Sequence, residues 1–169
     1  HIHVLRPPLH GDLAELVWWN VIREELVSGE VCPHLSTVYY LGTIDREYAG
    51  SMACYTPGDT RDVGVIEFVM TAERHRRKGV ADELLQMLIA EFTAEGGQAL
   101  YLCTANPVAG RLYEKHGFQY LTGDGMRYLG PGWDAFAASW FLHTGPACCR
   151  DAHWGDLPRV TALYNHPEP

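Results

Sequence analysis

The sequence contains few positive charges and no long run of apolar residues. Thirteen Lys and Arg stand against 21 Asp and Glu, for a formal net charge of −8, and nucleic acid phosphates and anionic membranes repel a chain of that sign. The longest uncharged apolar run near the C-terminus, residues 135–142, is far shorter than the roughly 20 residues of a membrane-spanning helix. We therefore expect a soluble protein that binds small cationic molecules rather than nucleic acid or a membrane.

Cysteine pairs with metal-binding or redox spacing are also missing. The five cysteines, at positions 32, 54, 103, 148 and 149, form no Cys-x-x-Cys motif, and an odd number without such pairs suits a reducing cytoplasm. The best cluster for a metal, Cys32-Pro33-His34 with Cys148-Cys149, lacks paired ligand spacing, so we expect no metal. The composition otherwise, 47% hydrophobic and 20% charged, is that of one globular domain.

Apolar periodicity predicts the order of strands and helices. A short apolar strand at residues 2–5 is followed by two helices between residues 12 and 27. Residues 37–44 and 48–55 predict a β-hairpin. Residues 63–71 are nearly all apolar, as in a strand that is covered on both faces, so we expect this strand to be central in the sheet.

The second half of the chain contains the clearest helix. Its apolar residues Val80, Leu84, Leu88 and Phe92 recur every four residues. The order that results is β-α-α-β-β-β-α-β-α-β-β, with helices between the later strands but none between the third and the fourth. We therefore predict an α/β (α+β) fold with a mixed sheet and helices on both faces. The remaining elements are a strand at 99–103, a helix at 107–115 and a hairpin of 118–122 with 126–129.

A basic cluster, Arg74-His75-Arg76-Arg77-Lys78-Gly79, lies between the predicted central strand and the long helix. Gly79 lets the backbone approach a ligand, and the first N–H groups of the helix, with its positive dipole end, attract anions. Such a loop can hold a diphosphate; the alternative is a solvated basic turn that balances the acidic helix. Neither the P-loop motif nor Gly-x-Gly-x-x-Gly is present, which weakens both nucleotide-binding interpretations.

This loop resembles the acyl-CoA loop of the GNAT superfamily of N-acetyltransferases. The family pattern Arg/Gln-x-x-Gly-x-Gly/Ala corresponds to Arg76-Arg77-Lys78-Gly79-Val80-Ala81, and Asn106-x-x-Ala109-x-x-Leu112-Tyr113-Glu114-Lys115-x-Gly117-Phe118 resembles the second motif of the family. The resemblance covers about residues 2–130. It implies a GNAT-like, mostly antiparallel mixed sheet, with a domain at 1–130 and a C-terminal extension at 131–169.

The resemblance implies acetyl-CoA as co-substrate. Its pantetheine arm would lie where the central strand and the strand from Ala99 separate, hydrogen-bonded to the backbone of Val69 and Thr71. Tyr113 would be the general acid for the departing thiolate; the alternative is a helix residue that packs on the sheet. The implied cofactor-binding residues are Val69, Met70, Thr71, Arg76, Arg77, Lys78, Gly79, Val80, Ala81, Asn106, Ala109 and Tyr113.

Glu67 is the first candidate for the base that an ammonium acceptor requires. Two-residue alternation places Glu67, Val69 and Thr71 on one face of the strand, provided that no bulge intervenes. Binding of the incoming cation, or pairing with a structural Arg, explains Glu67 equally well. Four aromatic residues either line the acceptor pocket or, as we favour, mostly pack in the core: Trp18, Trp19, Tyr39 and Tyr40.

The C-terminal extension repeats part of the beginning of the chain. Arg150 and Gly155-Asp156-Leu157 stand at the same spacing as Arg6 and Gly11-Asp12-Leu13. The extension is therefore either the start of a second GNAT-like unit in a tandem protein, or a helix that Asp156 caps and that packs on the domain. The extension also contains the apolar residues Trp133, Trp140 and Phe141. These side chains would dock the extension on its own domain or on a second copy in a homodimer.

Together these features predict an N-acetyltransferase. We expect it to move acetyl from acetyl-CoA to a primary amine, first of all that of a small cationic metabolite, by direct attack in a ternary complex. A protein amine and a longer acyl group fit the same residues. The alternative is a CoA-binding sensor, or an inactive half of a tandem acetyltransferase, and the presence of Tyr113 weighs against it.

Overall fold

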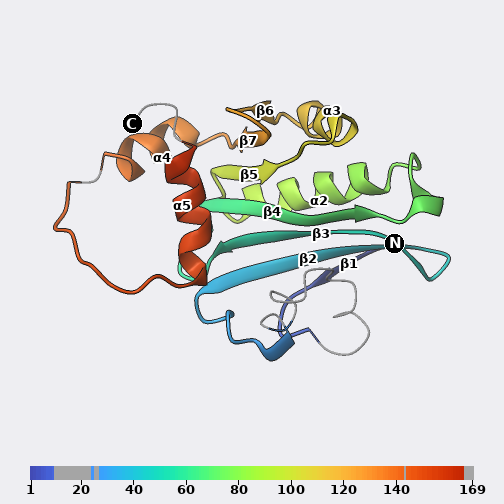
Figure 1. The fold of residues 1–169 in the computed structure, drawn as a ribbon, viewed down its shortest axis with the longest axis horizontal. Coiled ribbons are helices and arrows are strands. Elements are labelled where there is room, and N and C mark those ends of the chain that lie inside the picture. Colours follow the sequence, from blue (N-terminus) through green and yellow to red (C-terminus); the bar gives the residue numbers. More distant parts are fainter. Residues whose placement is uncertain (10–23, 25–26, 143, 166–169) are drawn as a thin grey trace.

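The computed structural model describes residues 1–9, 24, 27–142 and 144–165 (Figure 1). These residues form a seven-stranded sheet in the order β1-β2-β3-β4-β5-β7-β6. β4 lies in the middle, and among the described strands only β4 and β5 pair in parallel. The predicted mixed, mostly antiparallel sheet is confirmed. The strands are β1 (Ile2–Leu5), β2 (Leu35–Ile44), β3 (Glu47–Pro57), β4 (Val63–Thr71), β5 (Ala99–Cys103), β6 (Gln119–Tyr120) and β7 (Gly125–Leu129).

The helices that the structure describes lie on both faces of the sheet. They are α2 (Val80–Ala94), α3 (Pro107–Lys115), α4 (Trp133–Trp140) and α5 (Leu157–Tyr164), with 3-10 turns η2 (Glu73–His75) and η3 (Trp154–Asp156). The helices predicted between residues 12 and 27, with Trp18 and Trp19, lie outside the described residues except for the helical residues 24, 27 and 28. Among the described residues no helix has the length and the apolar character needed to cross a bilayer.

α2 forms where the four-residue repeat predicts it. Val80, Leu84, Leu88 and Phe92 are buried on the side that faces the sheet, where they form one core cluster with residues from β2 to β5. Beyond the C-terminal end of the helix, Gly96 has a φ of 93°, a left-handed conformation that glycine adopts without steric cost. The core between α2 and the sheet therefore fixes the position of α2, which begins at Val80 directly after the basic cluster.

α5 packs on the opposite face of the sheet. It contacts β3, β4 and β5, and Ala162 is fully buried in a cluster with Val63, Ala99 and Tyr101. In Figure 1, α5 crosses the strands at the end where β4 begins, which is the end remote from the basic cluster. The helix that packs on the domain is therefore present, and the start of a second GNAT-like unit at 131–169 stays a prediction.

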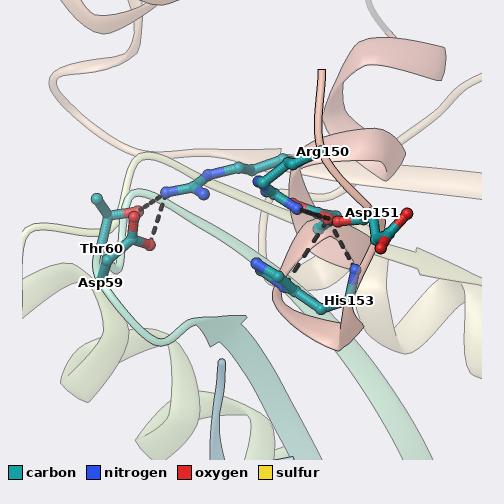
Figure 2. Close-up of polar contacts among 7 residues, drawn as sticks. Asp59, Thr60, Arg150, Asp151 and His153 are labelled. Atoms are coloured by element: carbon teal, nitrogen blue, oxygen red, sulfur yellow. Dashed lines mark hydrogen bonds and ion pairs between the residues drawn. The ribbon is translucent and has the colours of Figure 1, made fainter. Parts of the chain in front are cut away.

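Two ion pairs hold the segment before α5 and α5 itself (Figure 2). Arg159 donates to Asp59 Oδ1 at 2.6 Å, and Arg150 donates to both carboxylate oxygens of Asp156. The sequence predicts that Asp156 caps the helix that follows it, but its side chain makes no cap bond to α5. Its carboxylate instead accepts from the backbone N–H of His153 at 3.0 Å. Asp156 therefore caps the start of η3, and Arg150 beside it lowers the pKa of that carboxyl.

Candidate functional site

β4 and β5 pair only over the first residues of β4 and then separate. Their parallel pairing runs from Val63–Ala99 to Val65–Tyr101 and then stops, whereas β4 continues to pair with β3 as far as Thr71. The remainder of β4 thus has a free edge toward β5, with backbone N–H and C=O groups that can bind an extended ligand. The separation that the family resemblance implies is present.

A β-bulge at Phe68 changes which side chains share a face of β4. Ala53 pairs with Glu67 and Ser51 with Met70, so an extra residue lies on β4 in this interval, and Phe68 has a φ of 53°. A left-handed φ costs a non-glycine residue of the order of 1–3 kcal/mol.

The prediction that Glu67, Val69 and Thr71 share one face is therefore wrong. Val69 packs against the core cluster under α2. Phe68 is buried on the other face, in a cluster that includes Ala53, the partner of Glu67, and Tyr55. The bulge inserts one residue between Glu67 and Val69, so the two-residue alternation does not extend across it. Glu67 consequently faces away from α2.

Within the described part of the chain, two arginines of the basic cluster interact with other groups of the protein, whereas Arg77 and Lys78 do not. Arg74 pairs with Glu47 at 2.9 Å, and Arg76 Nε donates to the backbone oxygen of Thr71 at 3.4 Å. Arg77 and Lys78 are exposed and form no hydrogen bond or ion pair with other described residues. Two free cations thus stand directly before α2.

The start of α2 completes an anion site beside these cations. Gly79 is the N-cap residue, with a φ of 83° and no side-chain cap, so the first N–H groups of the helix have no intramolecular cap. A Cβ added at Gly79 would meet nothing within 4 Å, so the space in front of the helix is open. In Figure 1 this loop lies just beyond the end of β4, beside the start of α2. The geometry suits a phosphate or diphosphate.

Asp82 in the first turn of α2 is neutralised by α3. Lys115 Nζ donates to its two carboxylate oxygens at 2.7 and 2.9 Å, and His116 Nε2 lies 2.8 Å from Oδ1. The hydrogen bond from Lys115, followed by that from His116, lowers the pKa of Asp82. The ion pair offsets a negative charge beside the anion site and joins α2 to α3.

α3 carries Asn106 and Tyr113 into the site. Asn106 is the N-cap residue, and its Oδ1 accepts from the backbone N–H of Val108 at 3.0 Å. Tyr113 is 3% exposed and packs with Phe118 at 5.7 Å between ring centroids. Its hydroxyl makes no hydrogen bond with other described residues, and burial, followed by the charge of Glu67, raises the pKa of Tyr113 to about 12. The phenol therefore stays protonated at neutral pH.

Glu67 lies where β4 and β5 separate. The residue is exposed, and desolvation by the surrounding protein raises the pKa of its carboxyl. Its charge raises the pKa of Tyr113 on the α2 face and of buried Tyr55 on the other face, after the larger effect of burial on each. The charge of Glu67 thus acts on a tyrosine on each face of the sheet.

Other candidates fall into the core or outside the site. Tyr39 and Tyr40 are 0% and 2% exposed and point to opposite faces, so the core interpretation of these two tyrosines is confirmed. Among residues 1–9, 24, 27–142 and 144–165, no group of three or more His, Cys, Asp or Glu could hold a metal ion. Tyr55 was not a sequence candidate, because only the β3–β4 register places it near Glu67.

The chain matches a family model described as the acetyltransferase (GNAT) family over residues 12–118. A curated protein of Bacillus subtilis (strain 168), the uncharacterized N-acetyltransferase YsnE, is 42% identical over 66 residues, which cover 37% of this chain and 43% of that protein. The chain thus spans less than half the length of that relative.

Solved structures share the fold. An acetyltransferase of the GNAT family from Staphylococcus aureus MU50 has a TM-score of 0.55 and 12% identity, with 76% of this chain and 99% of that chain covered. A GNAT family acetyltransferase from Elizabethkingia anophelis, with acetyl-CoA bound, has a TM-score of 0.52 and 17% identity, with 76% and 97% covered. At these identities the likeness concerns the fold alone.

Proposed function

The chain belongs to the acetyltransferase (GNAT) family, and on this premise we propose that it transfers the acetyl group of acetyl-CoA to a primary amine. The observation that carries the proposal is the free edge of β4 together with the loop beyond it, where Arg77 and Lys78 have no partner among the described residues and the start of α2 has no side-chain cap. An extended arm that ends in a diphosphate fits this arrangement. A solved relative of the same fold has acetyl-CoA bound.

Each part of the co-substrate has a set of residues that suits it. Arg77, Lys78 and the N–H groups of Val80 and Ala81 would hold the diphosphate in front of Gly79. The arm would lie along the backbone of Val69, Met70 and Thr71 on the free edge, with Asn106 and Ala109 on the side of α3. Bound acetyl-CoA supplies a thioester carbonyl that an amine can attack.

Glu67 would receive the proton that the acceptor ammonium loses. Its exposed position leaves the carboxylate open to a cation, and its raised pKa makes it a better proton acceptor than an ordinary glutamate. The neutral amine then forms the new C–N bond, and the C–S bond breaks. A small cationic amine is the acceptor that the net charge of −8 and this carboxylate favour.

Tyr113 would stabilise the sulfur that leaves. Its pKa of about 12 is well above the value of about 8.5 for an ordinary thiol, so complete proton transfer from phenol to thiolate is uphill. A hydrogen bond from the phenol to the developing negative charge requires no such transfer. The structure thus favours the hydrogen-bonding role of Tyr113 over complete protonation of the sulfur.

Calorimetry with acetyl-CoA, followed by thiol release with a panel of amines, tests the proposal. We expect binding at micromolar protein and thiol release that depends on the amine. Binding without release from any amine would favour the alternative, a CoA-binding module that does not turn over. Absence of binding would contradict both functions.

A further inference from the structure

On the sheet face opposite α2, three hydroxyls of the described residues are buried without a hydrogen-bond partner, those of Thr37, Tyr55 and Tyr101. Thr37 and Tyr55 are 4% and 1% exposed, and Thr37 Oγ1 and the Tyr55 hydroxyl have no partner. These residues pair across β2 and β3, and alternation places both on the face of Tyr39 and Ala53. A buried, unpaired polar group is unfavourable, so the hydroxyl of Tyr55 calls for an explanation.

The register brings Tyr55 close to Glu67. Tyr55 pairs with Val65, and Ala53 pairs with Glu67, so Tyr55 and Glu67 are diagonal neighbours on adjacent strands. Diagonal neighbours on one face are within reach of aromatic and long side chains. The Phe68 ring lies edge-on to the Tyr55 ring, with centroids 6.1 Å apart, and helps to exclude solvent from it.

We propose that Tyr55 is a positioning residue for Glu67, its hydroxyl donating a hydrogen bond to the Glu67 carboxylate. This inference rests on the proposed role of Glu67. It assigns a partner to the unpaired hydroxyl of Tyr55. Glu67 is exposed and has three rotatable bonds, so its carboxylate can turn toward Tyr55, and in ligand-free structures such bonds are often long and tighten only with substrate.

The other ionisable groups near this pair are few. The Glu67 charge also acts on Tyr113 from α3, and Tyr39 from β2 acts on Tyr55. Cys103, two residues after Tyr101, stands by alternation on the same face of β5. Tyr101 on β5, opposite Val65, and Arg127 on β7, opposite Tyr101, also lie on this face, and the Tyr101 hydroxyl and Arg127 Nε are likewise without a partner among the described residues. Pairing of β4 with β5 ends at Val65, whereas β3 still pairs with β4 at Glu67, so Tyr55 is the donor on the strand that is held against Glu67.

Tyr55→Phe tests the proposal through the pH profile of kcat/KM for the amine. A hydroxyl that donates to a carboxylate favours its charged form and lowers its pKa. Its removal should raise the pKa of Glu67 and move the acid limb to higher pH by about one unit. The Kd for acetyl-CoA should stay unchanged.

Tyr40→Phe is the matched control. It removes a hydroxyl that donates to Glu91 at 2.8 Å on the opposite face, so it should lower the denaturation midpoint and leave the acid limb in place. Tyr55→Phe should not lower the midpoint, because no other group depends on its hydroxyl. An acid limb that stays at the wild-type pH in Tyr55→Phe, or that moves equally in the control, would overturn the inference.

A readout without turnover separates this inference from the proposed function. NMR titration of the Glu67 carboxyl carbon in wild type and Tyr55→Phe reports the pKa of Glu67 directly. A raised pKa in the variant supports the positioning role even if no amine is acetylated. An unchanged pKa refutes the role even in an active enzyme.

Discussion

At the scale of single residues, the burial of Tyr113 makes a kinetic prediction. Tyr113→Phe keeps the ring that packs with Phe118 but removes the donor for the leaving sulfur. We expect kcat to fall by about 10²- to 10⁴-fold, or roughly 3 to 5 kcal/mol, with little change in the Kd for acetyl-CoA. Thiol-release kinetics and calorimetry measure the two quantities, and an unchanged kcat would remove Tyr113 from the chemistry.

Gly79 makes a second residue-scale prediction, about binding. Gly79→Glu places a carboxylate in the open space before α2, so we expect loss of acetyl-CoA binding through charge repulsion and steric conflict. Gly96→Glu is a matched control, because Gly96 also has a positive φ and open space around it but lies beyond the other end of α2. Calorimetry should detect binding to the control only. Retained affinity in Gly79→Glu would move the phosphate site elsewhere.

At the scale of elements, the link between α2 and α3 depends on pH. The pKa of Asp82 is lowered in the folded protein, so its contribution to stability is present above the unfolded-state pKa of about 3.9 and is lost as pH falls through the folded-state pKa. Asp82→Asn should therefore destabilise the protein near pH 7 by less than about 1 kcal/mol, since the pair is largely exposed.

Urea midpoints at several pH values test this link. The difference between wild type and Asp82→Asn should narrow as pH falls below about 4. Glu83→Gln is the control, because Glu83 is also acidic and in the first turn of α2 but has no ion-pair partner among the described residues. A midpoint difference between wild type and Asp82→Asn that stays constant with pH, or that equals the difference between wild type and Glu83→Gln, would contradict the role of the ion pair.

Across the whole molecule, the sequence predicts the features that depend on neighbouring residues in the chain. It does not predict the features that depend on packing between distant strands. The bounds of α3 follow from Asn106 as a cap and Pro107 in the first turn, and α2 follows from its four-residue repeat. The bulge at Phe68 has no local signal, because a phenylalanine disfavours a positive φ and only packing between strands imposes it. The approach of Tyr55 to Glu67 depends on the β3–β4 register, which a shift of one residue would reverse.

The last prediction concerns how far the domain extends along the chain. Ala162 is fully buried on the sheet, and its neighbour Leu163 is 57% exposed on the outer side of α5. If α5 is an integral part of this domain, Ala162→Glu should lower the free energy of unfolding by about 2 to 4 kcal/mol, because a buried, unpaired carboxylate forces α5 off the sheet. Leu163→Glu, the control, should change it by about 0.5 kcal/mol or less.

Urea unfolding and limited proteolysis of both variants measure this difference. Proteolysis of Ala162→Glu should cut within residues 144–165 before it cuts the sheet, because undocking of α5 exposes that segment. Acetyl-CoA binding should survive in both variants, since α5 lies at the end of β4 remote from the basic cluster. Equal stabilities would mean that α5 does not depend on this sheet, as expected of a helix that belongs to a second unit.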